Sequence, residues 1–298
     1  MFDLGAAEFD RQHPARSPPL HVITSLHRSS VATIDELACP EPDTEPRSFG
    51  FTGNLHILLP VSGSLNYCEG GRSFLGGANH VVIVPVEREY EISHPIEGIR
   101  SLIVFPGSPL IDLFAEPGAP PGGDTEVRAV SPQLRLTACR LLSAARKGVD
   151  PLAVDELSID VCRAVLAAQK VASPAPLLGC GATLAKAKEF LHTHYRGAIS
   201  LSDVAAAAGV TPVYLTQLFK RSLGLNLYQY VTALRLNESL FALLDAPDLT
   251  TLALDLGFSS HSHFTSVFRA RFGTTPSCIR RQCLSDGASA LPPVFPQR

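Results

Sequence analysis

The chain carries one short pattern twice near its C-terminal end, and this repeat constrains the fold more than any other feature. Each copy holds a short apolar segment, a glycine, a second segment with helical apolar spacing and a closing glycine. The glycines are Gly209 and Gly224 in the first copy and Gly257 and Gly273 in the second. A short helix, a glycine turn and an amphipathic helix form a helix-turn-helix, so the repeat indicates two readers of one DNA segment.

The second helix of the first copy has one apolar and one polar face. Thr211 can cap this helix, and Pro212 suits its first turn. Positions i, i+3, i+4 and i+7 predict a buried face of Leu215, Leu218, Phe219 and Ser222. Gln can bond adenine edges, Val and Thr methyls can contact thymine methyls, and Lys can reach phosphate or guanine. The predicted DNA contacts are Val213, Thr216, Gln217, Lys220 and, at the helix end, Arg221.

The second copy follows the same plan. Ser259 or Ser260 is the expected helix cap, and Phe264, Val267 and Phe268 are expected to be buried. The outward face predicts DNA contacts from His261, Ser262, Thr265, Ser266 and Arg269. Arg271, near the helix end, is expected at a phosphate, whereas His263 is expected to bond within the domain.

Between the copies, residues 225–245 predict one long helix. A rigid helix there would fix the separation of the two readers, and successive major-groove faces on one side of B-DNA lie about 34 Å apart. We expect Arg235, inside this helix, to pair with Asp203 or Asp255 rather than to contact DNA.

The second copy makes a resemblance specific. Leu252-Ala253, Gly257-Phe258-Ser259-Ser260, Ser262-His263-Phe264, Phe268, Phe272-Gly273 and Pro276 stand at the spacing of a family signature. In these positions residues 182–283 resemble the DNA-binding domain of the AraC/XylS family of transcription regulators. Two departures are mild: Ser239 stands where Ala is usual, and Ile279 where an aromatic residue is common. The resemblance implies binding to adjacent major grooves of double-stranded DNA, dimers on paired sites, contact with RNA polymerase and, in most members, activation.

The first part of the chain is strand-like from Phe49, with short apolar runs separated by Gly, Asn and Pro. Such spacing predicts a sandwich or barrel, and the resemblance implies a cupin-like sensor barrel. The expected fold is thus α+β and multidomain. Its expected parts are a barrel at 1–125 with an irregular arm at 1–48, a helical packing or dimerisation segment at 126–172, a linker at 173–180, an all-α DNA-binding domain at 181–285 and a disordered tail at 286–298. Leu157 and Val161 are the predicted dimer contacts.

A sensor needs an apolar interior with a few polar groups. The candidates for effector binding are His56, Tyr67, Arg72, Tyr90 and His94, with Asn66 beside them. No His-x-His occurs among His56, His80 and His94, so we expect no metal, no other cofactor and no enzyme activity. The sequence does not identify the effector.

The segment that contains the repeat is basic, whereas the rest of the chain is acidic. Residues 180–285 hold 10 Lys and Arg against 6 Asp and Glu, whereas the remainder holds 15 against 22. A basic segment joined to an acidic one fits DNA binding at one end. The start lacks signal-peptide features and no run of about 18 apolar residues occurs, so a cytoplasmic protein without a membrane span is expected.

Three functional hypotheses remain open. The first is a regulator that responds to a small-molecule effector in its N-terminal domain. The second is a regulator whose N-terminal domain only dimerises. The third is a barrel enzyme with a DNA-binding tail, against which the missing nucleophile–base set counts.

Overall fold

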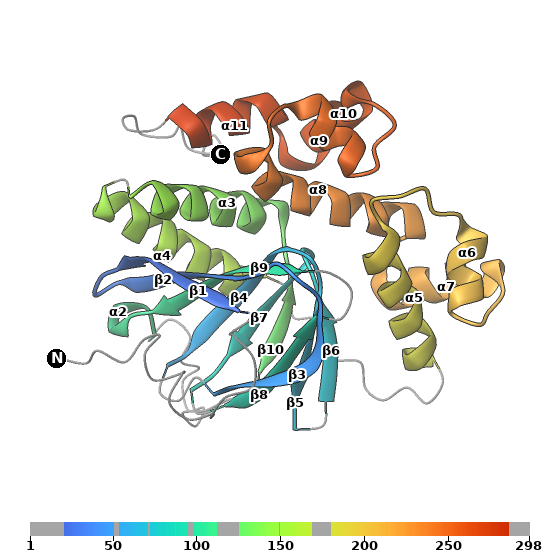
Figure 1. Cartoon of the computed structure of the whole chain (residues 1–298), viewed down its shortest axis with the longest axis horizontal. Helices are drawn as coiled ribbons and strands as arrows, with labels where there is room; N and C mark the ends of the chain where they lie inside the picture. Colours follow the sequence, from blue (N-terminus) through green and yellow to red (C-terminus); the bar gives the residue numbers. More distant parts are fainter. Residues whose placement is uncertain are drawn as a thin grey trace.

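The computed structural model describes residues 21–50, 54–70, 72–86, 88–94, 98–111, 125–148, 150–168 and 180–285. Within them, a sheet-rich N-terminal region is joined to a helical C-terminal region (Figure 1). The predicted tail at 286–298 and most of the predicted linker at 173–180 lie outside the described residues.

The N-terminal region contains two antiparallel sheets. The six-stranded sheet has the order β1-β2-β9-β4-β7-β10 and the four-stranded sheet the order β3-β8-β5-β6. Their strands are β1 (Val22–Arg28), β2 (Ala32–Cys39), β3 (Asp43–Gly50), β4 (His56–Ser62), β5 (Leu65–Glu69), β6 (Arg72–Gly76), β7 (His80–Val84), β8 (Glu89–His94), β9 (Ile99–Pro106) and β10 (Glu126–Ala129).

The central strands β9, β4 and β7 of the six-stranded sheet are buried on both faces, and successive side chains of a strand point to opposite sides. In β4, Ile57 and Leu59 join the core with the helices, whereas Leu58 joins Tyr67 and Tyr90 of the four-stranded sheet in a second core. This explains why the strands read as continuous apolar runs rather than as alternating ones.

The expected barrel is not confirmed, because among the described residues the two sheets pair separately and form no closed barrel. The expected irregular arm at 1–48 contains strands from Val22 onward, namely β1, β2 and most of β3. Polar residues in these strands, and a proline in β3, weaken the strand pattern, and pairing with neighbouring strands overrides weak strand propensity.

The helices after the sheets begin with well-defined caps. Ser131 and Asp150 accept hydrogen bonds at the starts of α3 (Pro132–Lys147) and α4 (Pro151–Ala167), each of which has proline in its first turn. The remaining helices are α2 (Ser108–Ile111), α5 (Cys180–His194), α6 (Leu201–Ala207), α7 (Pro212–Leu223), α8 (Leu227–Asp245), α9 (Leu249–Asp255), α10 (His261–Phe272) and α11 (Pro276–Ser285).

The predicted dimer contacts do not both lie at the surface. Val161 of α4 is fully buried in the core that α3 and α4 share with the six-stranded sheet, whereas Leu157 is half-buried. Val161 is therefore a core residue of the protomer, which agrees with the packing alternative for this segment rather than with a subunit contact at this position.

A buried arginine joins the N-terminal sheets to the C-terminal helices. Arg135 of α3 is fully buried and donates hydrogen bonds to the carbonyls of Pro60 (2.5 Å) and Val61 (3.0 Å) in β4 and of Asn237 (2.9 Å) in α8. Its guanidinium also lies 4.3 Å from the ring centroid of Phe241. Burial lowers its pKa to about 9, which still leaves it charged at neutral pH. Arg135 thus helps to fix the helix α8 to the sheet.

An ion-pair network adds a second joint at the surface. Glu36 of β2 pairs with Arg100 of β9 at 3.0 Å and with Arg146 of α3 at 2.5 Å. Both arginines also reach Asp245 at the end of α8. The four charges therefore link the six-stranded sheet, α3 and α8.

Burial lowers the pKa of three described histidines, His56, His80 and His192, and hydrogen bonds to tyrosines are formed by two of them. His56 Nε2 lies 2.9 Å from the Tyr90 hydroxyl, and His192 Nε2 lies 3.1 Å from the Tyr230 hydroxyl. Burial lowers the pKa of His56 to about 4 and that of His192 to about 3. Both side chains are therefore neutral in the folded protein at pH values where they are protonated in the unfolded chain.

These shifts predict that the protein loses stability as the pH falls from about 6.5 towards 4. The unfolded chain takes up protons below pH 6.5 while the folded state does not, so stability rises with pH in this window. Between pH 7 and 5 each histidine should lower the free energy of unfolding by roughly 2 kcal/mol. Urea unfolding at the two pH values measures this. His192→Gln should reduce the pH dependence, and the exposed His261→Gln should leave it unchanged. An unchanged dependence in His192→Gln would contradict the assignment.

Candidate DNA-binding interface

The first helix-turn-helix unit is built from α6 and α7, packed on α5 and α8. Ser200 and Asp203 form a capping box: the Asp203 carboxylate accepts the Ser200 N–H at 3.0 Å, and the Ser200 hydroxyl accepts the Asp203 N–H at 3.2 Å. Gly209 forms the turn with a φ of 69°, a left-handed conformation that favours glycine. Thr211 then caps α7 as predicted.

The two faces of α7 are separated as the spacing predicts, with one exception. Leu215 and Phe219 are buried against α5, α6 and α8, Leu218 is also buried, and Ser222 is exposed. Ser222 is the last polar position of the apolar stripe, at the end of the helix where packing runs out. The predicted DNA contacts all lie on the solvent side: Val213, Thr216, Gln217, Lys220 and Arg221.

Sequence reasoning left out Tyr214, which is also exposed, at 40%. It stands three residues before Gln217, and residues three apart share one helix face. Its ring can stack or its hydroxyl can bond at the same surface, and an aromatic residue outside the apolar stripe is the signal that could have identified it.

The second unit, α9 and α10 packed on α11 and α8, repeats this geometry. Asp248 accepts the N–H groups of Thr250 and Thr251 at the start of α9, and Ser260 caps α10. Gly257 forms the turn with a φ of 79°. A Cβ at this position would lie 2.4 Å from the Arg196 carbonyl oxygen, so only glycine fits here.

On α10, Phe264 and Phe268 are fully buried and Val267 is half-buried. Of the predicted DNA contacts, Thr265 is half-buried and lies 3.5 Å from His261 Nε2. The others are exposed: His261, Ser262, Ser266 and Arg269.

Two basic or aromatic side chains near this helix serve the fold. Arg271 points towards the Asn237 side-chain oxygen at 3.4 Å, and its expected contact with a phosphate stays a prediction. His263 Nδ1 lies 3.1 Å from the Ser259 hydroxyl and its Nε2 lies 3.4 Å from the Tyr228 hydroxyl, which places it within the domain as expected.

A single helix contributes to both units. Tyr230, Val231 and Leu234 of α8 pack in the core of the first unit, and Leu240 and Leu243 pack with the second. At 1.5 Å per residue, the 19 residues of α8 span about 28 Å. This length is comparable with the separation of successive major-groove faces.

Arg235 of α8 ties the two units together. Its guanidinium donates to the carbonyls of Tyr195 (2.6 Å) and Gly197 (2.8 Å) beside the first unit and of Gly257 (2.6 Å) in the turn of the second. The expected partners Asp203 and Asp255 are wrong, because carbonyls at the ends of neighbouring helices accept all three bonds. The role inside the fold is nevertheless structural.

The candidate effector residues divide into two places. His56, Tyr67 and Tyr90 meet between the sheets, where the two tyrosine rings stack at 4.8 Å and His56 bonds Tyr90. His94 lies at the other end of β8 and bonds His21. Arg72 lies in β6, where its backbone is opposite Glu69 of β5 in the strand register. The side chain of Arg72 is outside the part of the chain that the structure describes.

His56, Tyr67 and Tyr90 are all buried between the sheets. A cavity of about 330 Å³ lies instead at the junction of the sheets with the C-terminal helices. Val61 and Arg100 line it from the six-stranded sheet, and Glu238, Phe241 and Asp245 line it from α8. The junction is therefore a second place at which a small molecule can reach both regions.

No described helix is long and apolar enough to span a bilayer. Residues 204–282 match a family model described as a helix-turn-helix domain. The right origin-binding protein of Escherichia coli strain K12 is 34% identical over 106 residues, which cover 35% of this chain and 37% of that protein. The Msm operon regulatory protein of Streptococcus mutans is 28% identical over 97 residues, covering 32% and 34%. The chain thus matches only about a third of the length of these relatives.

Two solved structures are also similar to parts of this chain. An AraC-type DNA-binding regulator from Chromobacterium violaceum is 32% identical, covers 37% of this chain and 98% of its own, and has a TM-score of 0.34. ToxT from Vibrio cholerae, bound to an unsaturated fatty acid, is 14% identical over 88% of this chain and 99% of its own, with a TM-score of 0.35. Neither TM-score supports an argument about the overall arrangement, so the assignment depends on the sequence matches. Residues 204–282 are therefore a helix-turn-helix domain of the kind found in AraC-type transcription regulators, and these matches cover only about a third of the chain.

Proposed function

We propose that the protein is a sequence-specific DNA-binding transcription regulator that inserts α7 and α10 into adjacent major grooves. One observation carries the proposal: two capped helices expose polar faces and are held on one helix, α8, by both cores and by Arg235. A rigid connection of this kind sets a fixed distance between two DNA contacts.

The exposed side chains supply both kinds of DNA contact. Gln217 can bond an adenine edge, and Val213 and Thr216 carry methyl groups that fit against thymine. Lys220 and Arg269 lie near the ends of their helices, where contact with phosphates positions the protein without reading sequence.

We further propose that a small molecule controls DNA binding through the N-terminal sheets. The support is mechanical: Arg135 and the Glu36 network connect these sheets directly to α8. A ligand beside His56, Tyr67 and Tyr90, or in the junction cavity, would therefore act on the helix that carries both readers. A thermal-shift screen, followed by DNA-affinity measurements with each hit, tests this.

The direction of regulation and the oligomeric state stay predictions. We expect activation through RNA polymerase and a homodimer, as the family resemblance implies. A reporter assay with the target promoter and light scattering of the purified chain check the two expectations.

The test of the proposed function is selection of genomic DNA by the purified full-length protein at two salt concentrations. One enriched motif with two segments about one helical turn apart would support it. Salt-sensitive binding with no motif would overturn it, because phosphate contacts alone carry no sequence information.

We predict that Gln217→Ala weakens specific binding by about 1–3 kcal/mol, the usual discrimination of a good bidentate base contact. Binding to unrelated DNA should change little, because Gln217 contributes no phosphate charge. Fluorescence anisotropy with both DNAs measures the two affinities. Ser222→Ala, on the opposite side of α7, is the matched control and should leave both unchanged. Equal losses on both DNAs would contradict a base-reading role.

We predict that Arg235→Lys separates the two readers functionally. A lysine keeps the charge, but its three N–H groups lie on one nitrogen and cannot reach the three carbonyls that the separate nitrogens of the guanidinium bond. Affinity for the complete two-segment site should fall about tenfold or more, whereas affinity for a single segment should change little. The comparable change Arg163→Lys at an exposed arginine of α4 is the control. Equal loss at the complete and the single-segment site would show that Arg235 does not set the spacing.

A further inference from the structure

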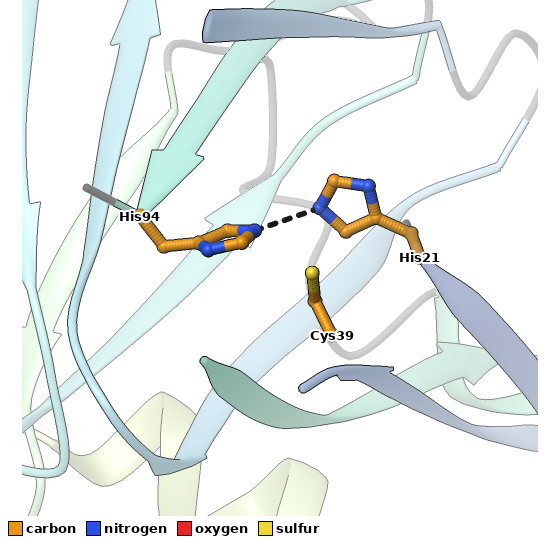
Figure 2. Close-up of side chains that lie close together, drawn as sticks. All are labelled: His21, Cys39 and His94. Carbon is orange, nitrogen blue, oxygen red and sulfur yellow. Dashed lines mark hydrogen bonds between the residues drawn. The ribbon is translucent and has the colours of Figure 1, made fainter. Parts of the chain in front are cut away.

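Three side chains with metal-binding atoms meet at one end of the two sheets. His21 precedes β1, Cys39 ends β2 and His94 ends β8, and their ligand atoms all lie within 4.8 Å of one another. Figure 2 shows the ring nitrogens of the two histidines facing each other, with the Cys39 sulfur beside the line that joins them. The strand β2 belongs to the six-stranded sheet and β8 to the four-stranded sheet. The packing of these two sheets on each other brings the distant residues together.

The cluster is enclosed on its inner side. His94 is 0% and Cys39 is 2% exposed, and Cys39 packs in the core between the sheets with Leu37 and Ile99. His21 is half-buried and forms the side nearest to solvent. An ion can therefore reach the site past His21, whereas the core around Cys39 and His94 closes the inner side of the site to water.

We propose that His21, Cys39 and His94 form a binding site for Zn²⁺ or a similar thiolate-preferring transition-metal ion. Two imidazoles and a thiolate are nitrogen and sulfur ligands, which suit Zn²⁺ and exclude the hard ions Mg²⁺ and Ca²⁺. Three protein ligands leave the fourth tetrahedral position for water or another small ligand.

The distances fit such an ion after a small adjustment. The two Nε2 atoms lie 3.0 Å apart, whereas two nitrogens bound tetrahedrally at 2.0–2.1 Å lie about 3.3 Å apart. The sulfur must come to within about 3.6 Å of each nitrogen, which takes at most about 1.2 Å of movement from its present position. A rotation of the Cys39 side chain within its rotamer well can supply most of this movement.

The protons around the site define what binding must change. The Asp43 N–H donates to His94 Nδ1 at 3.1 Å, so neutral His94 carries its proton on Nε2, facing His21. When Nε2 binds the ion, that proton moves to Nδ1 and the Asp43 amide turns away. The buried Asp43 carboxyl group is on the same residue and can accept the new Nδ1–H, as carboxylates commonly do behind metal-bound histidines.

Two features make this rearrangement local. The pairing of β3 with β8 is irregular directly after Asp43, so moving its amide breaks no regular ladder. The Cys39 thiol donates to the Glu41 carbonyl at 3.3 Å and loses its proton on binding. His94 keeps one proton in both states, so uptake of one ion releases one proton from the thiol.

The experiment uses the reduced full-length protein, stripped with a chelator and titrated with Co²⁺ and Zn²⁺. We expect one ion per chain by equilibrium dialysis, a thiolate-to-cobalt charge-transfer band, displacement of Co²⁺ by Zn²⁺, and release of about one proton per ion into weakly buffered solution. Cys39→Ser should abolish the band. His21→Gln, at the half-buried edge, should weaken affinity at least tenfold without disturbing the fold.

The control is Cys68→Ser, a half-buried thiol on β5 that lies outside the cluster. It should bind Co²⁺ with the parent spectrum and affinity. Absence of stoichiometric uptake, or a charge-transfer band that survives in Cys39→Ser, would overturn the site. If Cys39→Ser fails to fold, unchanged affinity in His21→Gln decides against it. None of these readouts involves DNA, so the result is independent of the proposed regulatory function.

Discussion

The packing of the C-terminal helices on the N-terminal sheets depends on the buried, charged side chain of Arg135. Arg135 donates to carbonyls on a strand of the six-stranded sheet and on the helix shared by both DNA-reading units. Carbonyl dipoles and the Phe241 ring replace its hydration, and removing such partners from a buried charge typically costs 3–5 kcal/mol. The three hydrogen bonds of Arg135 therefore hold α8 in a defined position relative to the sheets.

From α8, fixed geometry extends to the readers in both directions. One end of α8 is buried in each unit. Arg235 further restricts movement of the units relative to α8 by donating hydrogen bonds to the loops beside both. Caps and glycine turns then aim α7 and α10. Regulation by a ligand needs such stiffness, because a small shift in the sheets reaches the readers only through elements that move as one body.

Much of the C-terminal region follows from local rules. Thr211, Ser260 and the two turn glycines have the roles that their types predict, since caps and left-handed turns depend on a few neighbouring atoms. The partners of long side chains do not follow from local rules. Arg235 and Arg271 were predicted to meet acids and phosphate, but both bond oxygens brought near by packing.

The N-terminal region shows the same division more strongly. Apolar runs located β4, β7 and β9, because burial on both faces of a sheet demands apolar side chains at successive positions. The strands β3, β6 and β10 were missed, since edge pairing needs little apolar sequence and depends on a partner strand. A search for His-x-His likewise passed over His21, Cys39 and His94, whose nearness arises only from the sheets.

The sequence alone thus determined the two helix-turn-helix units, their caps and turns, and which faces of α7 and α10 are exposed. These depend on periodicity and on interactions within a few residues. Only the tertiary structure decided that the sheets form no closed barrel in the described residues, that Arg135 attaches α8 to them, and that two histidines and a cysteine share one place. Those features join residues as far as 102 positions apart, and contacts at such separations depend on how whole elements pack.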